Sequence, residues 1–282
     1  MPHPLLERRH TDERAASLLR TIGTLFAEFG PPTQDSGNRS YGVRVGEERY
    51  FVKTAGDPFE PAASLAHAER VELLRNAVRL HASCRHPALV PLLHTIESPD
   101  GPLLVFPWCE GELLNVPRER RADPASALQR FRRLPVATIG RCLDAIFELH
   151  VALASAGWVA ADFYDGCLIY DFAADRLGVV DLDTYHQGPF HNPRDRWFGS
   201  TRFMAPEEFR RGAVIDERTT VFTLGRTALV LLGEGGDRSE RFVGPEACSA
   251  VVWKACAEDP AHRFETVAAF HQAWRAAWGS GR

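Results

Sequence analysis

The sequence predicts an α+β protein in which a small, strand-rich part precedes a larger, helical part. Apolar residues alternate over residues 41–45, and the turn residues Gly46 and Glu47 lead into the apolar run 50–52, a pattern typical of a β-hairpin. Residues 136–156 and 219–232 instead carry apolar side chains at helical spacing, which predicts a mainly helical later sequence. With 282 residues, 45% of them hydrophobic, the chain is long enough for two compact parts.

Charge, cysteine usage and hydropathy exclude several classes of function. The formal net charge of −4 predicts no nucleic-acid partner. The six cysteines show no C-x-x-C spacing, so we expect reduced thiols and a cytoplasmic location. No apolar stretch approaches the length of about 18 residues that a membrane helix needs, and the N-terminus lacks the core of a signal peptide, so no membrane partner is expected.

The N-terminal residues 1–34 are predicted to form a helical extension. Residues 11–29 place apolar side chains on one side of an amphipathic helix, and Gly30, Pro31 and Pro32 would stop it. We expect this helix to pack on the strand-rich part. The alternative is that its apolar side binds a regulatory partner.

Lys53 comes directly after the apolar residues 50–52, in the second strand of the hairpin. It is one of only two lysines, with Lys254, among 33 basic residues. A lysine in an apolar strand of an arginine-rich chain indicates a need for a compact ammonium group. The alternative is a strand lysine that extends to solvent. Residues 61–83 are predicted to form the next helix, on which Glu69, Glu72 and Asn76 share one face.

Aspartates follow two predicted elements in the middle of the chain. Asp162 lies in a polar stretch between a helix and the apolar residues 167–170, and a carboxylate on such a loop can accept a hydroxyl proton. Asp181 and Asp183 follow the apolar residues 177–180. Their hard oxygen ligands suit Mg²⁺ bound to nucleotide phosphates.

These segments, AADFYDGC, DLD and the later APE, resemble the H-R-D-L-x-x-x-N, D-F-G and A-P-E motifs of protein kinases, in the same order. The resemblance covers residues 35–270. It implies a bilobal kinase-like fold, with an N-lobe and hinge at residues 35–109 and a helical C-lobe at 110–282, that uses ATP and Mg²⁺. It also implies that Asp162 is the catalytic base and that Asp181 holds metal.

The resemblance implies a set of nucleotide-binding residues. Lys53 would hold the phosphates with a glutamate partner, for which Glu72 is favoured, while Glu69 and Asn76 remain alternatives. Gly37 and Gly42 would be the outer glycines of a phosphate-covering loop, although a plain hairpin explains them nearly as well. In the hinge-like residues 103–114, the Pro107 carbonyl and the Cys109 amide would contact adenine, and Phe51 would crowd the roof of that pocket.

Residues 199–207 resemble the substrate-facing G-T-x-x-Y-M-A-P-E segment of serine/threonine kinases, which implies a protein substrate. The resemblance also implies an ion pair between Glu207 and Arg263. Removing one partner of such a buried pair would cost about 3 to 5 kcal/mol.

Several positions depart from the kinase pattern. Cys167 stands in place of the second metal-binding asparagine, Tyr164 in place of the catalytic-loop lysine, Ala161 in place of the arginine and Thr220 in place of a supporting aspartate. A thiol is a poor Mg²⁺ ligand, so we hypothesise that Asp183 compensates as a second metal-binding carboxylate.

Three functions fit these features. The first is an ATP-dependent serine/threonine protein kinase that transfers the γ-phosphoryl group to a protein hydroxyl. The second is a pseudokinase that binds nucleotide as a scaffold, and the third is a small-molecule phosphotransferase. The segment at 199–207 argues against the third, because such phosphotransferases lack it.

Overall fold

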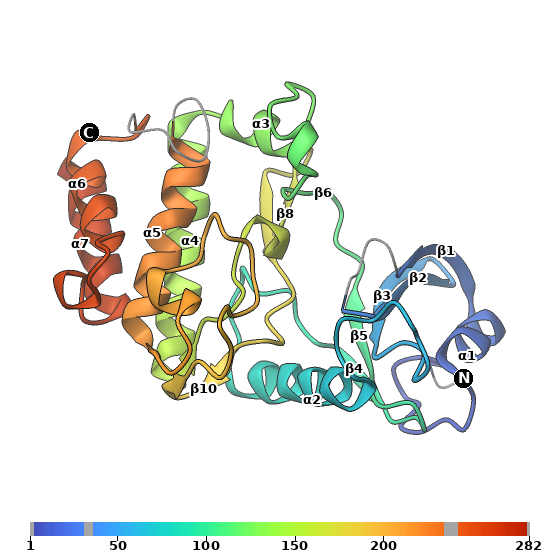
Figure 1. Ribbon diagram of the computed structural model, residues 1–282. Coiled ribbons are helices and arrows are strands. Elements are labelled where there is room, and N and C mark those ends of the chain that lie inside the picture. The colour runs from blue at the N-terminus through green and yellow to red at the C-terminus, as the bar shows by residue number, and fades with distance from the viewer. Residues whose placement is uncertain (1–2, 31–35, 234–241, 281–282) are drawn as a thin grey trace. The chain divides into compact units, whose positions relative to one another are not determined.

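The computed structural model describes residues 3–30, 36–233 and 242–280, and it has the mixed α+β character that the sequence predicts. The chain divides into two compact units (Figure 1). Unit 1 comprises Met1–Arg85 and Val90–Cys109, and unit 2 comprises His86–Leu89 and Glu110–Arg282. No helix among the described residues is long and apolar enough to cross a membrane.

Unit 1 is built on a five-stranded antiparallel sheet in the order β1-β2-β3-β5-β4. Its strands are β1 (Thr24–Phe29), β2 (Arg39–Val45), β3 (Glu48–Thr54), β4 (His94–Ile96) and β5 (Leu103–Pro107), and its helices are α1 (Ala15–Ile22) and α2 (His67–Ser83). The hairpin expected at residues 41–52 is confirmed as β2 and β3, which pair around the turn at Gly46 and Glu47.

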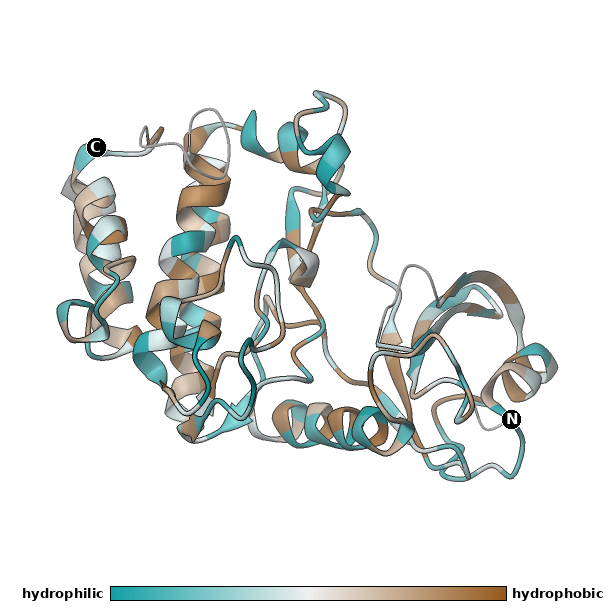
Figure 2. Cartoon of the chain, viewed as in Figure 1, coloured by the Kyte–Doolittle hydropathy of each residue, from teal (hydrophilic) through white to brown (hydrophobic). Residues whose placement is uncertain are grey.

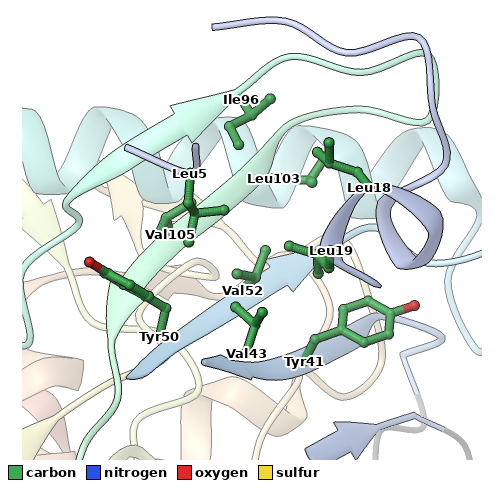
Figure 3. Close-up of a cluster of buried hydrophobic side chains, with 10 residues drawn as sticks. All are labelled: Leu5, Leu18, Leu19, Tyr41, Val43, Tyr50, Val52, Ile96, Leu103 and Val105. Atoms are coloured by element: carbon green, nitrogen blue, oxygen red, sulfur yellow. The ribbon is translucent and has the colours of Figure 1, made fainter. Parts of the chain in front are cut away.

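The two faces of this sheet pack against different helices. On one face, Val43 and Val52 meet the fully buried Leu18 and Leu19 of α1 (Figure 3). On the other face, Leu104 of β5 packs against α2. Because each fully buried leucine contributes about 1.5 to 3 kcal/mol, the contact with α1 is a substantial part of the stability of unit 1.

The prediction of one helix over residues 11–29 is wrong, because only α1 is helical and β1 follows it. The helix ends at Gly23, whose backbone is extended and whose α-carbon lies against β2: a Cβ there would stand 2.4 Å from the carbonyl oxygen of Arg44. The residues after Gly23 then pair with β2 as its edge neighbour. The apolar side of α1 is buried in the core, so the first of the two interpretations, packing on the strand-rich part, is the one confirmed. The predicted stop at Pro31 and Pro32 lies outside the described residues.

Unit 2 is mainly helical. Its helices are α3 (Ala127–Arg132), α4 (Val136–Ser155), α5 (Glu217–Leu232), α6 (Glu246–Ala255) and α7 (Val267–Ser280), with short 3-10 turns η1 (Arg118–Arg120), η2 (Asp165–Cys167), η3 (Pro206–Phe209) and η4 (Pro260–His262). The helices expected at 136–156 and 219–232 are confirmed as α4 and α5. Hydrophobic residues gather along these two helices (Figure 2), and α5 is buried on nearly every side.

Short strands in unit 2 carry the loops of interest. They are β6 (Glu112–Leu113), β7 (Trp158–Val159), β8 (Leu168–Asp171), β9 (Arg176–Val179), β10 (His186–Gln187), β11 (Phe190–His191) and β12 (Val214–Ile215). Strand β8 pairs with both β6 and β9, while β7 pairs with β10 and β11 with β12. The Asp162 loop therefore lies between β7 and β8, and the Asp181 loop lies between β9 and β10.

Candidate active site

Asp162 and Asp181 share an unusual backbone conformation. Each has φ of 62°, in the left-handed region that residues other than glycine rarely adopt, and Asp175 is the remaining such residue among those described. Backbone strain of this kind costs about 1 to 3 kcal/mol and clusters at functional sites. Asp162 is half-buried, whereas Asp181 is exposed.

The thiol of Cys167 lies between these two loops. Its Sγ is 3.6 Å from the carbonyl oxygen of Asp162 and 3.7 Å from that of Asp181. Burial, together with the nearby Asp181 and Asp162 charges, raises the pKa of Cys167 well above its usual range, so the group is a neutral thiol. The thiol therefore connects the two loops through weak hydrogen bonding to their main chains.

Two threonines support the main chain just before Asp162. The Ala160 amide donates to the Oγ1 of Thr220 on α5 at 3.0 Å, and the Thr184 hydroxyl donates to the Ala161 carbonyl at 2.7 Å. The sequence comparison placed Thr220 where kinases have a supporting aspartate. Its hydroxyl retains a contact from α5 to the Asp162 loop.

A buried histidine that no sequence pattern marks contacts residues of the same loops. His150 of α4 has Nδ1 at 2.7 Å from the Ile146 carbonyl and Nε2 at 2.7 Å from the Tyr185 hydroxyl, and its ring packs edge-on against Phe163. Burial lowers the pKa of His150 to about 4. The neutral ring therefore donates from Nδ1 and accepts the Tyr185 proton at Nε2. Phe163, next to Asp162, and Tyr185, two residues after Asp183, thus both contact this imidazole.

The segment at residues 199–207 approaches Asp162 directly. Gly199 has φ of 122°, and a Cβ added to it would stand 3.1 Å from Oδ1 of Asp162 and 3.5 Å from its Cα. Both the conformation and the short approach favour glycine at this position. A chain segment thus passes within contact distance of the candidate base.

The far end of that segment is held by the expected ion pair between Glu207 and Arg263, which is confirmed. The guanidinium donates to both carboxylate oxygens, at 2.6 and 2.9 Å, and the Thr219 hydroxyl adds a third bond at 2.8 Å. The side chains of Glu207 and Arg263 are 3% and 0% exposed. A bidentate buried pair of this kind fixes both position and orientation.

Glu208, next in the chain, is also buried. One of its oxygens accepts the Ala205 amide at 2.7 Å. Burial, with a further contribution from the adjacent Glu207, raises the pKa of the Glu208 carboxyl to about 8. The native protein therefore keeps a proton on Glu208 at pH values where the unfolded chain has lost it.

Glu208→Gln is expected to remove a stabilising contribution that weakens as pH rises. Because the native pKa of Glu208 is about 8 against a usual 4.5, the native state binds the extra proton between these values, and the stability that Glu208 contributes falls as pH rises through this window. The slope from this one group is at most about 1.4 kcal/mol per pH unit. Urea unfolding at pH 5, 6.5 and 8 would measure it. The depressed pKa of His150 contributes the opposite slope below about pH 6.5 in both proteins, so it cancels in the comparison. Equal pH dependence in the two proteins would contradict the prediction.

The candidate metal ligands differ in accessibility. Asp181 is exposed and Asp183 is 6% exposed, although the two are separated by one residue. Within the described residues, no cluster of three or more histidine, cysteine, aspartate or glutamate side chains is arranged to hold a metal. This donor set fits Mg²⁺ of the kind that is held by one or two carboxylates and otherwise by phosphates and water. Asp181 is the carboxylate best placed for direct binding.

In unit 1, Lys53 lies on the α2 side of the sheet. It stands opposite Ser40 of β2 and Leu104 of β5, and it alternates with Val52, whose side chain joins the core on the other side. Phe51, on the same side as Lys53, meets Phe29 at 6.0 Å between ring centroids. The crowding of an adenine pocket by Phe51 stays a prediction.

The three candidates for the partner of Lys53 all lie on α2, and each has another hydrogen-bond partner on the same segment. Glu72 is exposed and accepts from Arg79 at 2.7 Å, and Asn76 accepts from the same guanidinium at 3.2 Å. Glu69 accepts the Ala66 amide at 3.1 Å in the first turn of the helix. An ion pair of Glu72 with Lys53 therefore stays a prediction.

The buried charge on α2 is Arg70, which the sequence analysis missed. It is 1% exposed, and its guanidinium donates to the main-chain carbonyls of Gly37, Ala55 and Asp57. A basic residue on the buried side of an amphipathic helix gives no distinctive sequence signal. Its partners are main-chain groups, which no residue pattern marks.

The two glycines expected in a phosphate-covering loop occupy different structures. Gly37 has φ of 92° and precedes β2, but Gly42 lies inside β2, paired with Phe51 and Ala27. A Cβ on Gly42 would stand 2.7 Å from the Phe26 ring. Gly42 therefore lies in the hairpin, as the alternative interpretation has it, and a role of Gly37 in covering phosphate stays a prediction. The connection between β1 and β2 is residues 30–38, of which 31–35 lie outside the described residues.

The hinge-like residues form the C-terminal end of unit 1. Pro107 ends β5 opposite Tyr50, and the next amide, that of Trp108, donates to the Arg49 carbonyl at 2.9 Å. Cys109 is half-buried and is the last residue of the unit. The Trp108 ring packs edge-on against Phe26 at 4.7 Å between centroids.

The structure thus brings Asp162, Asp181 and Asp183 together in unit 2, with Cys167 and the segment 199–207. The other predicted site residues, namely Lys53, Glu72, Gly37, Gly42, Pro107 and Cys109, all belong to unit 1. Comparison with known proteins adds no relative: no protein-family model matches the sequence, and no curated protein is significantly similar to it.

Proposed function

We propose that this chain is an ATP-dependent serine/threonine protein kinase that transfers the γ-phosphoryl group to a protein hydroxyl. The observation that carries the proposal is the contact between Asp162 and Gly199. It joins a half-buried, backbone-strained carboxylate to a segment of the sequence type that presents protein substrates. A general base has to lie within hydrogen-bond reach of the hydroxyl that it deprotonates.

Each candidate site residue has a separate role in the proposed reaction. The hydroxyl oxygen of the substrate forms a bond to the γ-phosphorus while the bond to the bridging oxygen of the ADP leaving group breaks, and Asp162 accepts the hydroxyl proton. The Glu207–Arg263 pair holds the substrate segment, and Lys53 binds phosphate oxygens. Asp181 would hold Mg²⁺, which would neutralise phosphate charge.

Asp183→Asn tests whether the second carboxylate of this loop contributes to metal use. If Asp183 compensates for the thiol at Cys167, the variant is expected to need about tenfold more Mg²⁺ for half-maximal nucleotide binding, in line with the loss of an outer metal-site group. A titration of fluorescent ATP analogue binding against Mg²⁺ would measure this. Asp171→Asn, on strand β8, is the matched control. Unchanged metal dependence in Asp183→Asn would remove the compensation hypothesis.

A nucleotide-binding pseudokinase is the second candidate. The buried neutral thiol of Cys167 favours it, because the group that stands at an expected metal-ligand position bonds to main-chain carbonyls instead. In that case the loops would hold nucleotide without efficient transfer.

Transfer from γ-labelled ATP separates the candidates. The wild type is incubated with Mg²⁺ or Mn²⁺, alone and with a generic basic protein, and nucleotide binding is measured in parallel by fluorescence. Label on protein hydroxyls supports the kinase proposal. Binding without label overturns it in favour of the pseudokinase, and label recovered only on small molecules would point to the third function, a small-molecule phosphotransferase.

A further inference from the structure

A second link joins the Asp162 loop to the substrate-like segment. Nη2 of Arg202 forms an ion pair with Oδ2 of Asp165. Their side chains are 8% and 1% exposed, so the pair is almost fully removed from water. Asp165 lies in the segment AADFYDGC and Arg202 in the segment 199–207, but neither residue has a predicted role of its own.

The two links are in register. Asp162 contacts Gly199, and three residues further along each segment Asp165 pairs with Arg202. The two segments therefore run together through two contacts that are spaced equally along both chains. A slip of either segment would break both contacts.

Asp165 and Arg202 are each held by further contacts to other parts of unit 2. The Arg202 carbonyl accepts from Nε of Arg226 on α5 at 2.9 Å, and its guanidinium lies 5.0 Å from the Phe203 ring centroid. The Asp165 carbonyl accepts the Asn115 amide at 3.1 Å. Asp165 also begins the turn η2, which ends at Cys167. Movement of Asp165 would thus reach the thiol that lies against Asp162 and Asp181.

We propose that Asp165 and Arg202 are positioning residues that set the register between the catalytic loop and the substrate segment, so that the substrate hydroxyl meets Asp162. This inference rests on the proposed kinase function. A buried ion pair adds little net stability compared with a hydrophobic pair, and its best-attested use is to fix one arrangement over its alternatives. Here the arrangement is the alignment of two segments that carry no regular pairing to each other.

The test is a double-mutant cycle read out by steady-state kinetics. The proteins are the wild type, Asp165→Asn, Arg202→Met and the variant with both substitutions, which removes both charges and so leaves no unpaired buried ion. Because displacement of about 1 Å costs on the order of 100-fold in rate, we expect each variant to lower kcat by about 10- to 100-fold. We expect KM for ATP to change less than threefold and the double variant to be no worse than either single one. Arg141→Met, which breaks the exposed pair with Asp175, is the matched control.

Hydrogen exchange supplies a readout that does not need activity. Amides of residues 160–167 and 199–205 are expected to exchange faster together in each single variant, while those of α7 stay unchanged. A folded double variant with kcat within twofold of the wild type overturns the proposal, as does faster exchange in only one of the two segments. If the wild type itself transfers no phosphate, the kinase function fails, and the exchange data still decide whether the two segments are coupled.

Discussion

Asp162→Asn is expected to lower phosphate transfer by about 100- to 10,000-fold, the range that a positioned general base contributes. The amide cannot take the hydroxyl proton, whereas it keeps the size of the carboxylate and tolerates the left-handed backbone at φ of 62°. Nucleotide binding is expected to stay within a few-fold of the wild type, because the change leaves Lys53 and Asp181 intact. Single-turnover transfer from γ-labelled ATP would give the rate, and fluorescence titration the affinity.

Two comparisons make this result specific. Asp123→Asn removes a half-buried carboxylate of unit 2 that bonds locally, to Arg120 and the Ala125 amide, and is expected to leave transfer unchanged. Circular dichroism melting would show that Asp162→Asn is folded. A folded Asp162→Asn protein with wild-type transfer would exclude Asp162 as the base and would leave the proposed mechanism without its central residue.

Arg263→Met is expected to destabilise the protein by about 3 to 5 kcal/mol, because it leaves the Glu207 carboxylate buried with an uncompensated charge. The loss is large since the guanidinium donates five hydrogen bonds: two to Glu207 and three to the carbonyls of Ala257, Arg218 and Glu258. Chemical unfolding followed by tryptophan fluorescence would measure it.

The exposed pair Arg141–Asp175 provides the contrast. Its side chains are 61% and 53% exposed, so Arg141→Met is expected to cost about 0 to 1 kcal/mol. The variant Glu207→Gln with Arg263→Met removes both charges and is expected to recover part of the loss. Similar costs for Arg263→Met and Arg141→Met would mean that the Glu207 site relaxes to admit water.

The sequence was most informative where one type of periodicity was unambiguous. Helices α4 and α5 have long apolar patterns with helical spacing, and both lie close to where they were expected. Residues 24–29 were misread because Leu25, Phe26 and Phe29 fit a helical face as well as they fit a strand. Pairing with β2 decides between the two, and pairing depends on residues far along the chain.

Gly42 shows a different limit of the sequence. A phosphate-covering loop and a plain hairpin both account for a glycine at this position. The structure shows why a glycine is needed there: the Phe26 ring occupies the space that a side chain would take. A glycine in a sequence marks a close approach without revealing whether a ligand or a side chain approaches.

Contacts between polar side chains could be predicted only where the resemblance to kinases supplied both partners. Glu207 and Arg263 were paired correctly across 56 positions by resemblance. Asp165 with Arg202 and His150 with Tyr185 were not, since each pair is made by the fold and neither has a spacing rule. The contact that Thr220 makes with the Ala160 amide can be identified only once the neighbouring main chain is in place.

The three carbonyls that Arg70 holds have a consequence for how α2 can be regulated. Its partners, Gly37, Ala55 and Asp57, contribute main-chain oxygens, which carry no titratable group and accept no modification. A link between a guanidinium and carbonyls persists at any pH at which the protein is folded, because neither side loses its charge or its lone pairs. Helix α2 is therefore fastened to the two ends of the β2–β3 hairpin in a way that no change of side-chain charge can release. To move this helix, a regulator would have to displace the main chain on either side of the hairpin, where the three carbonyls lie.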